Sequence, residues 1–133
     1  MSLFSGTLGI MEKALDASSL RQKVLAANIA NVDTPHYKRM DVRFEDVLAK
    51  ALANQRGLEA YRTDPRHIPF GGWVSLTPQI VTDNQTIFNH NGNNVDLDLE
   101  MAELAKTQIK YQALVDRVNG YFNKLKTVIN EGR

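Results

Sequence analysis

The histidines are the first residues in this sequence to test for metal chemistry, because imidazole is a common ligand of zinc. The chain of 133 residues contains three of them, His36, His67 and His90, and it contains no cysteine. None of the three stands four residues from another, as the two ligands of a helical HExxH zinc site would. We therefore expect no metal site and only local hydrogen bonds for the histidines. The absence of cysteine excludes disulfides, thiolate zinc sites and a cysteine nucleophile.

Carboxylates, a serine nucleophile or a phosphate-binding loop would each give the chain a route to catalysis. Asp41, Glu45 and Asp46 are close in sequence, but they fall at a predicted short surface helix and are expected to face solvent. The sequence contains neither a G-x-S-x-G nucleophile elbow nor a G-x-x-x-x-G-K-[ST] loop, and Gly71-Gly72 is too short to surround a phosphate. We expect neither an enzyme nor a cofactor. A small site within the irregular middle segment remains an alternative that ligand or metal screening would test.

Two asparagines, Asn28 and Asn31, stand on one face of a predicted helix just before Thr34 and Pro35. Asparagine tolerates left-handed geometry at a helix end, and its amide can bond to carbonyls that the helix leaves unpaired. The residue before a proline is biased away from helical geometry. This stretch is therefore predicted to end the helix. In an assembly the same amides have a second possible role, which is to bond across chains and fix the register of packed helices.

The elements that must position these residues are best marked in the last third of the chain. Steps of alternately four and three residues from Leu97 reach apolar side chains at nine of ten positions, which predicts one long helix over 97–130. Asp96 or Asp98 is the expected N-cap, and Lys124 and Lys126 lie toward the other end, as the helix dipole prefers. The ten positions are Leu97, Met101, Leu104, Gln108, Tyr111, Val115, Val118, Phe122, Leu125 and Ile129.

The N-terminal segment shows the same stepping and predicts a second long helix over 5–31. Its apolar positions are Phe4, Leu8, Met11, Leu15, Leu25, Ile29 and Val32, with Ser18 and Gln22 at the other two. The two helices would be roughly 40 and 50 Å long, whereas a typical globular helix has only about a dozen residues.

The middle of the chain differs from both ends in composition and in the spacing of its apolar residues. Apolar spacing from Phe44 to Leu52 predicts a short amphipathic helix, and 57–94 is rich in Gly, Pro, Asn and Thr, with short strands predicted at 74–76 and 79–82. The predicted fold is thus mainly α: two long terminal helices packed antiparallel as a coiled-coil-like hairpin, with a short helix and an irregular, part-β middle. We expect one domain over 1–133, made of an N-terminal helix and its polar stretch (1–35), the middle (36–94) and a C-terminal helix (95–133).

Charge and hydropathy exclude several classes of function. The net charge is +1, so no basic surplus exists to neutralise phosphates, and we expect no nucleic-acid partner. No stretch of about 18 apolar residues exists to cross a bilayer, and we expect no membrane insertion. The first charged residue is the acidic Glu12, which does not fit a cleavable secretory signal.

Apolar residues beside the heptad positions widen both stripes beyond what one partner helix covers. This excess favours a subunit of an assembly. A soluble two-helix adaptor or export chaperone that holds a partner helix is the alternative. The flanking residues are Leu3, Ile10, Ala14, Leu20 and Val24 in the first helix and Ile109, Leu114 and Val128 in the second.

Several short motifs resemble one known family. Residues 27–39, ANIANVDTPHYKR, resemble the N-terminal signature of the bacterial flagellar rod and hook family. Within that family, 91–104 (NGNNVDLDLEMAEL), 110–114 (KYQAL) and 66–69 (RHIP) are similar to the proximal rod proteins. His36 departs from the pattern, because the family usually has Gly after the proline.

The resemblance implies a structural role rather than catalysis. It implies a subunit of the basal-body rod that the flagellar type III export apparatus carries out unfolded, without a cleavable signal. The subunit would assemble in the periplasmic space into the shaft that transmits motor torque to the hook. Its partners would be other copies of itself, neighbouring rod proteins, a FliE-type adaptor and the export apparatus, and its termini would become ordered helices on assembly.

On this interpretation the functional residues are interfaces. The heptad positions of both helices would contact other subunits, and the signature positions would set the register and the exit from the first helix. The predicted interface residues are Leu8, Met11, Leu15, Leu25, Asn28, Ile29, Asn31, Thr34, Tyr37, Met101, Leu104, Tyr111, Val115, Val118, Phe122 and Leu125.

Overall fold

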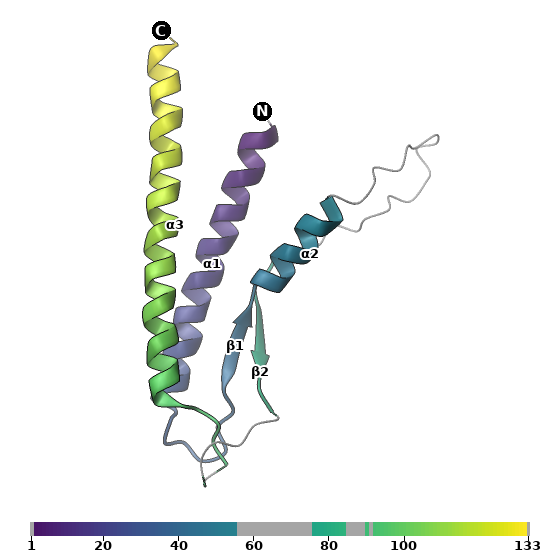
Figure 1. Ribbon diagram of the computed structural model, residues 1–133, viewed down its shortest axis with the longest axis vertical. Coiled ribbons are helices and arrows are strands. Elements are labelled where there is room, and N and C mark those ends of the chain that lie inside the picture. Colours follow the sequence, from purple (N-terminus) through teal and green to yellow (C-terminus); the bar gives the residue numbers. More distant parts are fainter. Residues whose placement is uncertain (1, 56–75, 85–89, 91, 133) are drawn as a thin grey trace, which may run out of the picture.

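A computed structural model describes residues 2–55, 76–84, 90 and 92–132 of the chain. The fold of these residues is mainly helical, as the sequence predicts (Figure 1). The elements in chain order are α1 (Ser2–Ala30), β1 (Met40–Arg43), α2 (Glu45–Gln55), β2 (Gln79–Thr82) and α3 (Leu97–Glu131).

The two long helices form the predicted antiparallel hairpin. In Figure 1, α1 descends from the N-terminus and α3 returns beside it, so both termini lie at one end, which we call the free end. The other end, where α1 stops and α3 starts, is called the base. With 35 residues against 29, α3 is longer than α1 by roughly 9 Å. The axes of the two helices separate toward the free end.

Local chemistry explains both helix boundaries at the base. The side chain of Asp96 accepts hydrogen bonds from the backbone N–H groups of Asp98, at 3.0 Å, and Leu99, at 3.3 Å, so the predicted N-cap is confirmed. At the end of α1, Asn31 donates from its side-chain amide to the carbonyl of Ala27 at 2.8 Å, which confirms its predicted role in ending the helix.

His36 has a φ of 59°, the left-handed region in which a glycine would be unstrained. That conformation gives a physical reason for the glycine that the family resemblance places there. Gly92 lies against it with a φ of 79°, and a Cβ at this glycine would stand 2.8 Å from Nδ1 of His36. Gly92 therefore allows the close approach of the two connecting segments at the base.

A two-stranded antiparallel sheet packs beside the hairpin. The pairs are Met40 with Thr82, Asp41 with Val81, Val42 with Ile80 and Arg43 with Gln79. The strand predicted at 79–82 is confirmed as β2, whereas β1 was not predicted, because its four residues carry no pattern that separates them from a loop. Of the strand predicted at 74–76, residues 74 and 75 lie outside the described residues, and Leu76 is not in a strand. The predicted short helix is confirmed as α2.

Among the described residues, the buried apolar side chains are few, and most lie on α1 and on or next to β1. β1 packs on α1, and Val95 in the segment before α3 is also buried. None of the described helices is long and apolar enough to span a membrane. The buried apolar residues are Ala17, Val24, Leu25, Val42, Phe44 and Val95.

Candidate functional site

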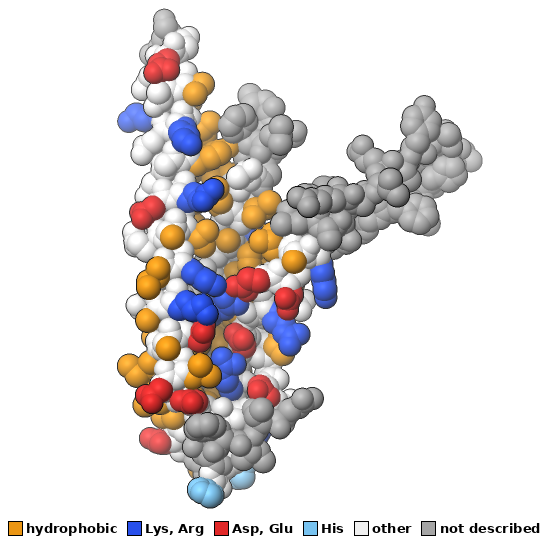
Figure 2. Space-filling view, in the orientation of Figure 1, with side chains coloured by type: hydrophobic (Ala, Val, Ile, Leu, Met, Phe, Trp, Pro, Cys, Tyr) orange, Lys and Arg blue, Asp and Glu red, His pale blue; other side chains and the backbone are white. Residues whose placement is uncertain are grey.

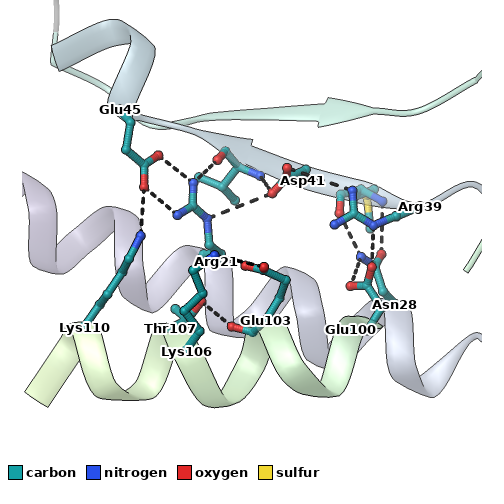
Figure 3. A network of polar contacts seen from close by, with 12 residues as sticks. Arg21, Asn28, Arg39, Asp41, Glu45, Glu100, Glu103, Lys106, Thr107 and Lys110 are labelled. Atoms are coloured by element: carbon teal, nitrogen blue, oxygen red, sulfur yellow. Dashed lines mark hydrogen bonds and ion pairs between the residues drawn. The ribbon is translucent and has the colours of Figure 1, made fainter. Parts of the chain in front are cut away.

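A cluster of four polar side chains connects the two helices at the base, and Figure 3 shows three of them, Asn28, Arg39 and Glu100. We call Asn28, Tyr37, Arg39 and Glu100 the polar cluster. Glu100 has no exposed side-chain surface, although it stands on a helix whose apolar residues are largely exposed. Its carboxylate accepts from Nδ2 of Asn28 at 2.9 Å and from Nε of Arg39. A carboxylate buried in this way would be strongly destabilising without these partners.

The Asn28 side chain uses its full hydrogen-bonding capacity. Besides Glu100, its Nδ2 donates to the carbonyl of Met40 at 2.8 Å. Its Oδ1 accepts from the N–H of Met40 at 3.0 Å and from the Tyr37 hydroxyl at 3.2 Å. The fully buried amide of Asn28 on α1 thus bonds to Tyr37, to Met40 of β1 and to Glu100 of α3. All of these hydrogen bonds lie within one chain, so the Asn28 side chain points into its own fold.

The charges of the cluster support one another. Burial lowers the pKa of Arg39, but the hydrogen bond and charge of Glu100 outweigh burial, and the pKa is raised overall. Burial also raises the pKa of the Tyr37 hydroxyl, and the nearby charge of Glu100 adds to this. Arg39 is therefore a cation beside the buried carboxylate, and Tyr37 is a neutral donor to Asn28, which in turn donates to Glu100.

A second group of buried amides lies in the segment before α3. Nδ2 of Asn93 donates to the carbonyls of Asn31 and Val32, both at 2.9 Å, and of Thr34 at 3.0 Å. Asn94 accepts from the N–H of Arg39 at 2.6 Å. Asn93 thus holds the turn that follows α1, from up to 62 residues away in the sequence, and the resemblance motif NNVD acquires a structural role.

Arg21 and Glu45 form a bidentate pair between α1 and the start of α2, with both contacts at 2.7 Å (Figure 3). Nη2 of Arg21 also donates to the carbonyl of Val42, and Nζ of Lys110 lies 3.7 Å from the Glu45 carboxylate. The hydrogen bonds from Arg21 lower the pKa of Glu45 to about 2, with smaller contributions from the start of α2 and from Lys110. The Arg21–Glu45 pair thus connects the start of α2 to α1 of the hairpin.

The groove beside this pair carries charges of both signs, which gives no preference for an anion or a cation. Among the described residues, no three His, Cys, Asp or Glu side chains gather as a metal-binding group. The charged residues that line the groove are Arg21, Arg39, Lys106 and Lys110 together with Asp41, Glu45, Asp83, Asp96 and Glu103.

The predicted interface residues fall into two groups in the structure. Most are wholly or partly buried within the chain itself, and in the α3 stripe they alternate with the buried polar residues Glu100 and Thr107. The partly or fully buried positions are Leu8, Met11, Leu15, Leu25, Asn28, Ile29, Asn31, Tyr37, Leu104, Val115, Val118 and Leu125.

The remaining predicted positions are exposed. They are Thr34, Met101, Tyr111 and Phe122, with Met101 57% exposed. Five further apolar side chains of α3 that are not among the predicted interface residues named from the sequence are also exposed, and Ile109 is 72% exposed. Figure 2 shows hydrophobic side chains along the visible face of α3. We call the exposed apolar residues of α3 the outer surface; they are Leu97, Leu99, Met101, Ile109, Tyr111, Phe122, Val128 and Ile129.

Sequence reasoning did not find Glu100, Arg39 and Arg21 as members of these groups. Charged residues are normally solvated, so an apolar periodicity passes over them. One feature of the sequence could have indicated that Glu100 is buried. It stands three residues after Leu97 and four before Leu104, and so on the same side of the helix as Leu104.

Comparisons with known proteins agree with one another. Residues 10–38 match the family model described as "Flagella basal body rod protein". The chain is 50% identical over 133 residues to the flagellar basal body rod protein FlgB of Bacillus subtilis (strain 168), which covers 100% of both chains. It is 35% identical to the FlgB of Borrelia hermsii, over 97% of this chain and 99% of that protein, and 32% identical to that of Escherichia coli (strain K12), over 94% of each.

Proposed function

Since the chain belongs to the FlgB family of flagellar basal body rod proteins, and is thus a structural component of the rod, we propose how it acts there. It is a non-catalytic subunit of the shaft that transmits motor torque to the hook. It reaches the periplasmic space unfolded through the flagellar export apparatus, without a cleavable signal. Its neighbours are further copies of itself, other rod proteins and a FliE-type adaptor.

The observation that carries this proposal is the outer surface of α3. Eight large apolar side chains are exposed along a helix of 35 residues, while the buried apolar side chains among the described residues lie in α1, in β1 and Phe44 after it, and in the segment before α3. Exposed apolar side chains in such number are unfavourable in a free monomer and favourable where another helix covers them. A helical tube of subunits supplies that cover.

The burial of the predicted interface residues supports two different roles for them, contact with other subunits and packing within the chain. Met101, Tyr111 and Phe122 are exposed and would contact neighbouring subunits. Val118 and Leu125, which are half-buried, would hold α3 against the rest of its own chain. A substitution in the first group should therefore affect assembly alone, whereas one in the second should also destabilise the subunit.

The test introduces a charge on the outer surface. In the bacterium that encodes this chain, the variants Met101→Asp and Ile109→Asp would replace the native protein. We expect loss of swimming in soft agar and loss of the protein from purified basal bodies, because a buried carboxylate opposes helix packing. The isolated variants should retain wild-type circular dichroism and thermal unfolding.

Asn119→Asp is the matched control, because Asn119 is an exposed polar residue of α3 and the change adds the same charge. This variant should swim normally. Val118→Asp should lose both assembly and stability. Normal swimming by Ile109→Asp and Met101→Asp would contradict the proposed interface, and recovery of the wild-type chain in a soluble cytoplasmic complex, absent from basal bodies, would favour an adaptor or export chaperone.

A further inference from the structure

The heptad stripes of α1 and α3 do not by themselves define one alignment of the hairpin. A stripe that repeats every seven residues packs almost equally well after a displacement of one heptad, which is about 10 Å along the axis. The α1 stripe is interrupted only by Ser18 and Gln22, and the α3 stripe only by Gln108. Some other feature must select the observed register.

Glu100 meets this requirement. It is fully buried, and its two side-chain partners, Asn28 and Arg39, lie on α1 and on the segment after α1. We propose that the contacts of Glu100 with Asn28 and Arg39 set the register of the hairpin, so that Glu100 is its register-determining residue. The inference goes beyond the rod assignment, because it concerns how one subunit selects its own conformation.

The physical argument is the cost of every alternative alignment. Displacing α3 by one heptad in either direction moves Glu100 about 10 Å from Asn28 and Arg39. In one direction Glu100 would stand level with Arg21, which already pairs with Glu45. In the other it would pass Ala30, where α1 ends. In both cases Arg39 would lose its hydrogen-bonded carboxylate. A buried charge without a partner is far more unfavourable than the loss of an ordinary apolar contact.

Thr107 shows by contrast why Glu100 carries this information. It is the other buried polar side chain of α3, one heptad further along the helix. Its hydroxyl donates to the carbonyl of Glu103 at 2.7 Å, within α3 itself. That bond survives any displacement of α3 along α1, so Thr107 cannot distinguish one register from another.

The register has a consequence for assembly. A displacement by one heptad keeps the same face of α3 toward α1, but it moves the exposed Met101 and Ile109 by about 10 Å along the axis relative to the rest of the subunit. A subunit with mixed registers would offer its neighbours mixed surfaces. A single register therefore gives every copy the same outer surface.

The test measures register in the isolated full-length chain. Because the sequence has no cysteine, Glu12→Cys and Lys126→Cys provide two unique sites for spin labels, both at exposed positions. Asn28 is level with Glu100, so Glu12 is level with about residue 116, and Lys126 lies roughly 15 Å further along the axis. A displacement by one heptad changes this axial separation by about 10 Å.

The register variant combines Arg39→Met with Glu100→Leu, which removes both charges and keeps the bonds of Asn28 to Met40 and Tyr37. The matched control is Thr107→Leu, which also replaces a buried polar side chain of α3 by leucine. We expect one narrow distance distribution in the labelled parent and in the control. We expect a broad or two-peaked distribution in the register variant, with helical circular dichroism retained.

Three outcomes would overturn the proposal. One narrow distribution in the register variant, at the parent distance, would mean that other contacts select the register. Loss of helical circular dichroism in that variant would mean that the contacts of Glu100 supply the fold itself and not the choice between alignments. A broad distribution in the Thr107→Leu control as well would also refute the specific role of Glu100.

Discussion

At the scale of single residues, the subunit relies on buried amides and one buried carboxylate. Asn28, Asn93 and Glu100 have no exposed side-chain surface, and each contacts segments far away in the sequence. Asn93 donates to three carbonyls of the turn that follows α1. Bonds of this kind depend on direction, so they define a geometry more sharply than apolar contacts do.

Glu45 gives a pH-dependent prediction at the same scale. Its pKa is about 2 in the folded chain against an ordinary 4.5, so it binds a proton less readily when folded. Its contribution to stability is therefore complete above about pH 4.5 and is lost as the pH falls toward 2. Because the Glu45 side chain is 58% exposed, the contribution is modest.

We predict that Glu45→Gln lowers Tm by at most about 4 °C at pH 7, and that this difference disappears as the pH approaches 2. The measurement is thermal unfolding of the two chains by circular dichroism across this pH range. Asp46→Asn, an exposed change in the same helical turn, is the control and should show no comparable trend. A Tm difference that is unchanged from pH 7 to pH 2.5 would contradict the assignment.

At the scale of elements, α3 is long and exposed, and its start is the part that local chemistry defines best. Asp96 caps the helix in extended geometry, with φ of −101° and ψ of 112°, and two backbone N–H groups point at its carboxylate. Asp98 and Glu100 follow in the first turn, where the helix dipole favours negative charge. The cap and the polar cluster are thus adjacent.

We predict that Asp96→Ala costs about 1 kcal/mol of unfolding free energy, since two N–H groups lose their acceptor. Asp98→Ala, which removes a first-turn charge but no cap, should cost about 0.3 kcal/mol. Urea denaturation of the isolated chains measures both values. Equal costs for the two variants would show that charge and not capping accounts for the effect.

At the scale of the whole molecule, the subunit has a tightly bonded base and a free end with little core. The polar cluster, the Asn93 contacts and most buried apolar residues gather near the base, whereas α3 beyond Thr107 has no fully buried residue in the described part of the chain. The two helix axes also separate toward the free end (Figure 1). Cooperative stability should therefore decrease from the base to the termini.

We predict slow amide hydrogen exchange in residues 24–30 and 97–107 of the dilute isolated chain, and exchange at least 100-fold faster in residues 7–12 and 119–131. The measurement is exchange followed by mass spectrometry, resolved by peptide. The same experiment on assembled rods should slow exchange at the free end, because neighbouring helices then cover it. Uniform slow exchange in the monomer would indicate a self-sufficient helical domain.

The sequence by itself determined the elements whose causes are local. Heptad spacing predicted both long helices within a few residues, because an apolar stripe of that length fits no other regular structure. Asp96 and Asn31 were identifiable because capping depends on residue type and immediate neighbours. The family was also accessible, since its motifs are short and contiguous.

Only the tertiary structure decided which stripe residues are inside and which are outside. Periodicity treats Leu104 and Phe122 alike, yet the first is half-buried and the second is exposed. Distance from the base does not explain the difference, because Met101 at the base is exposed and Leu125 near the free end is partly buried. The tertiary structure also placed Glu100 beside Arg39, which is 61 residues away in the sequence, and no local pattern predicts a partner at that separation. Burial of a charge is a property of the folded whole, because its partners come from segments that meet only on folding.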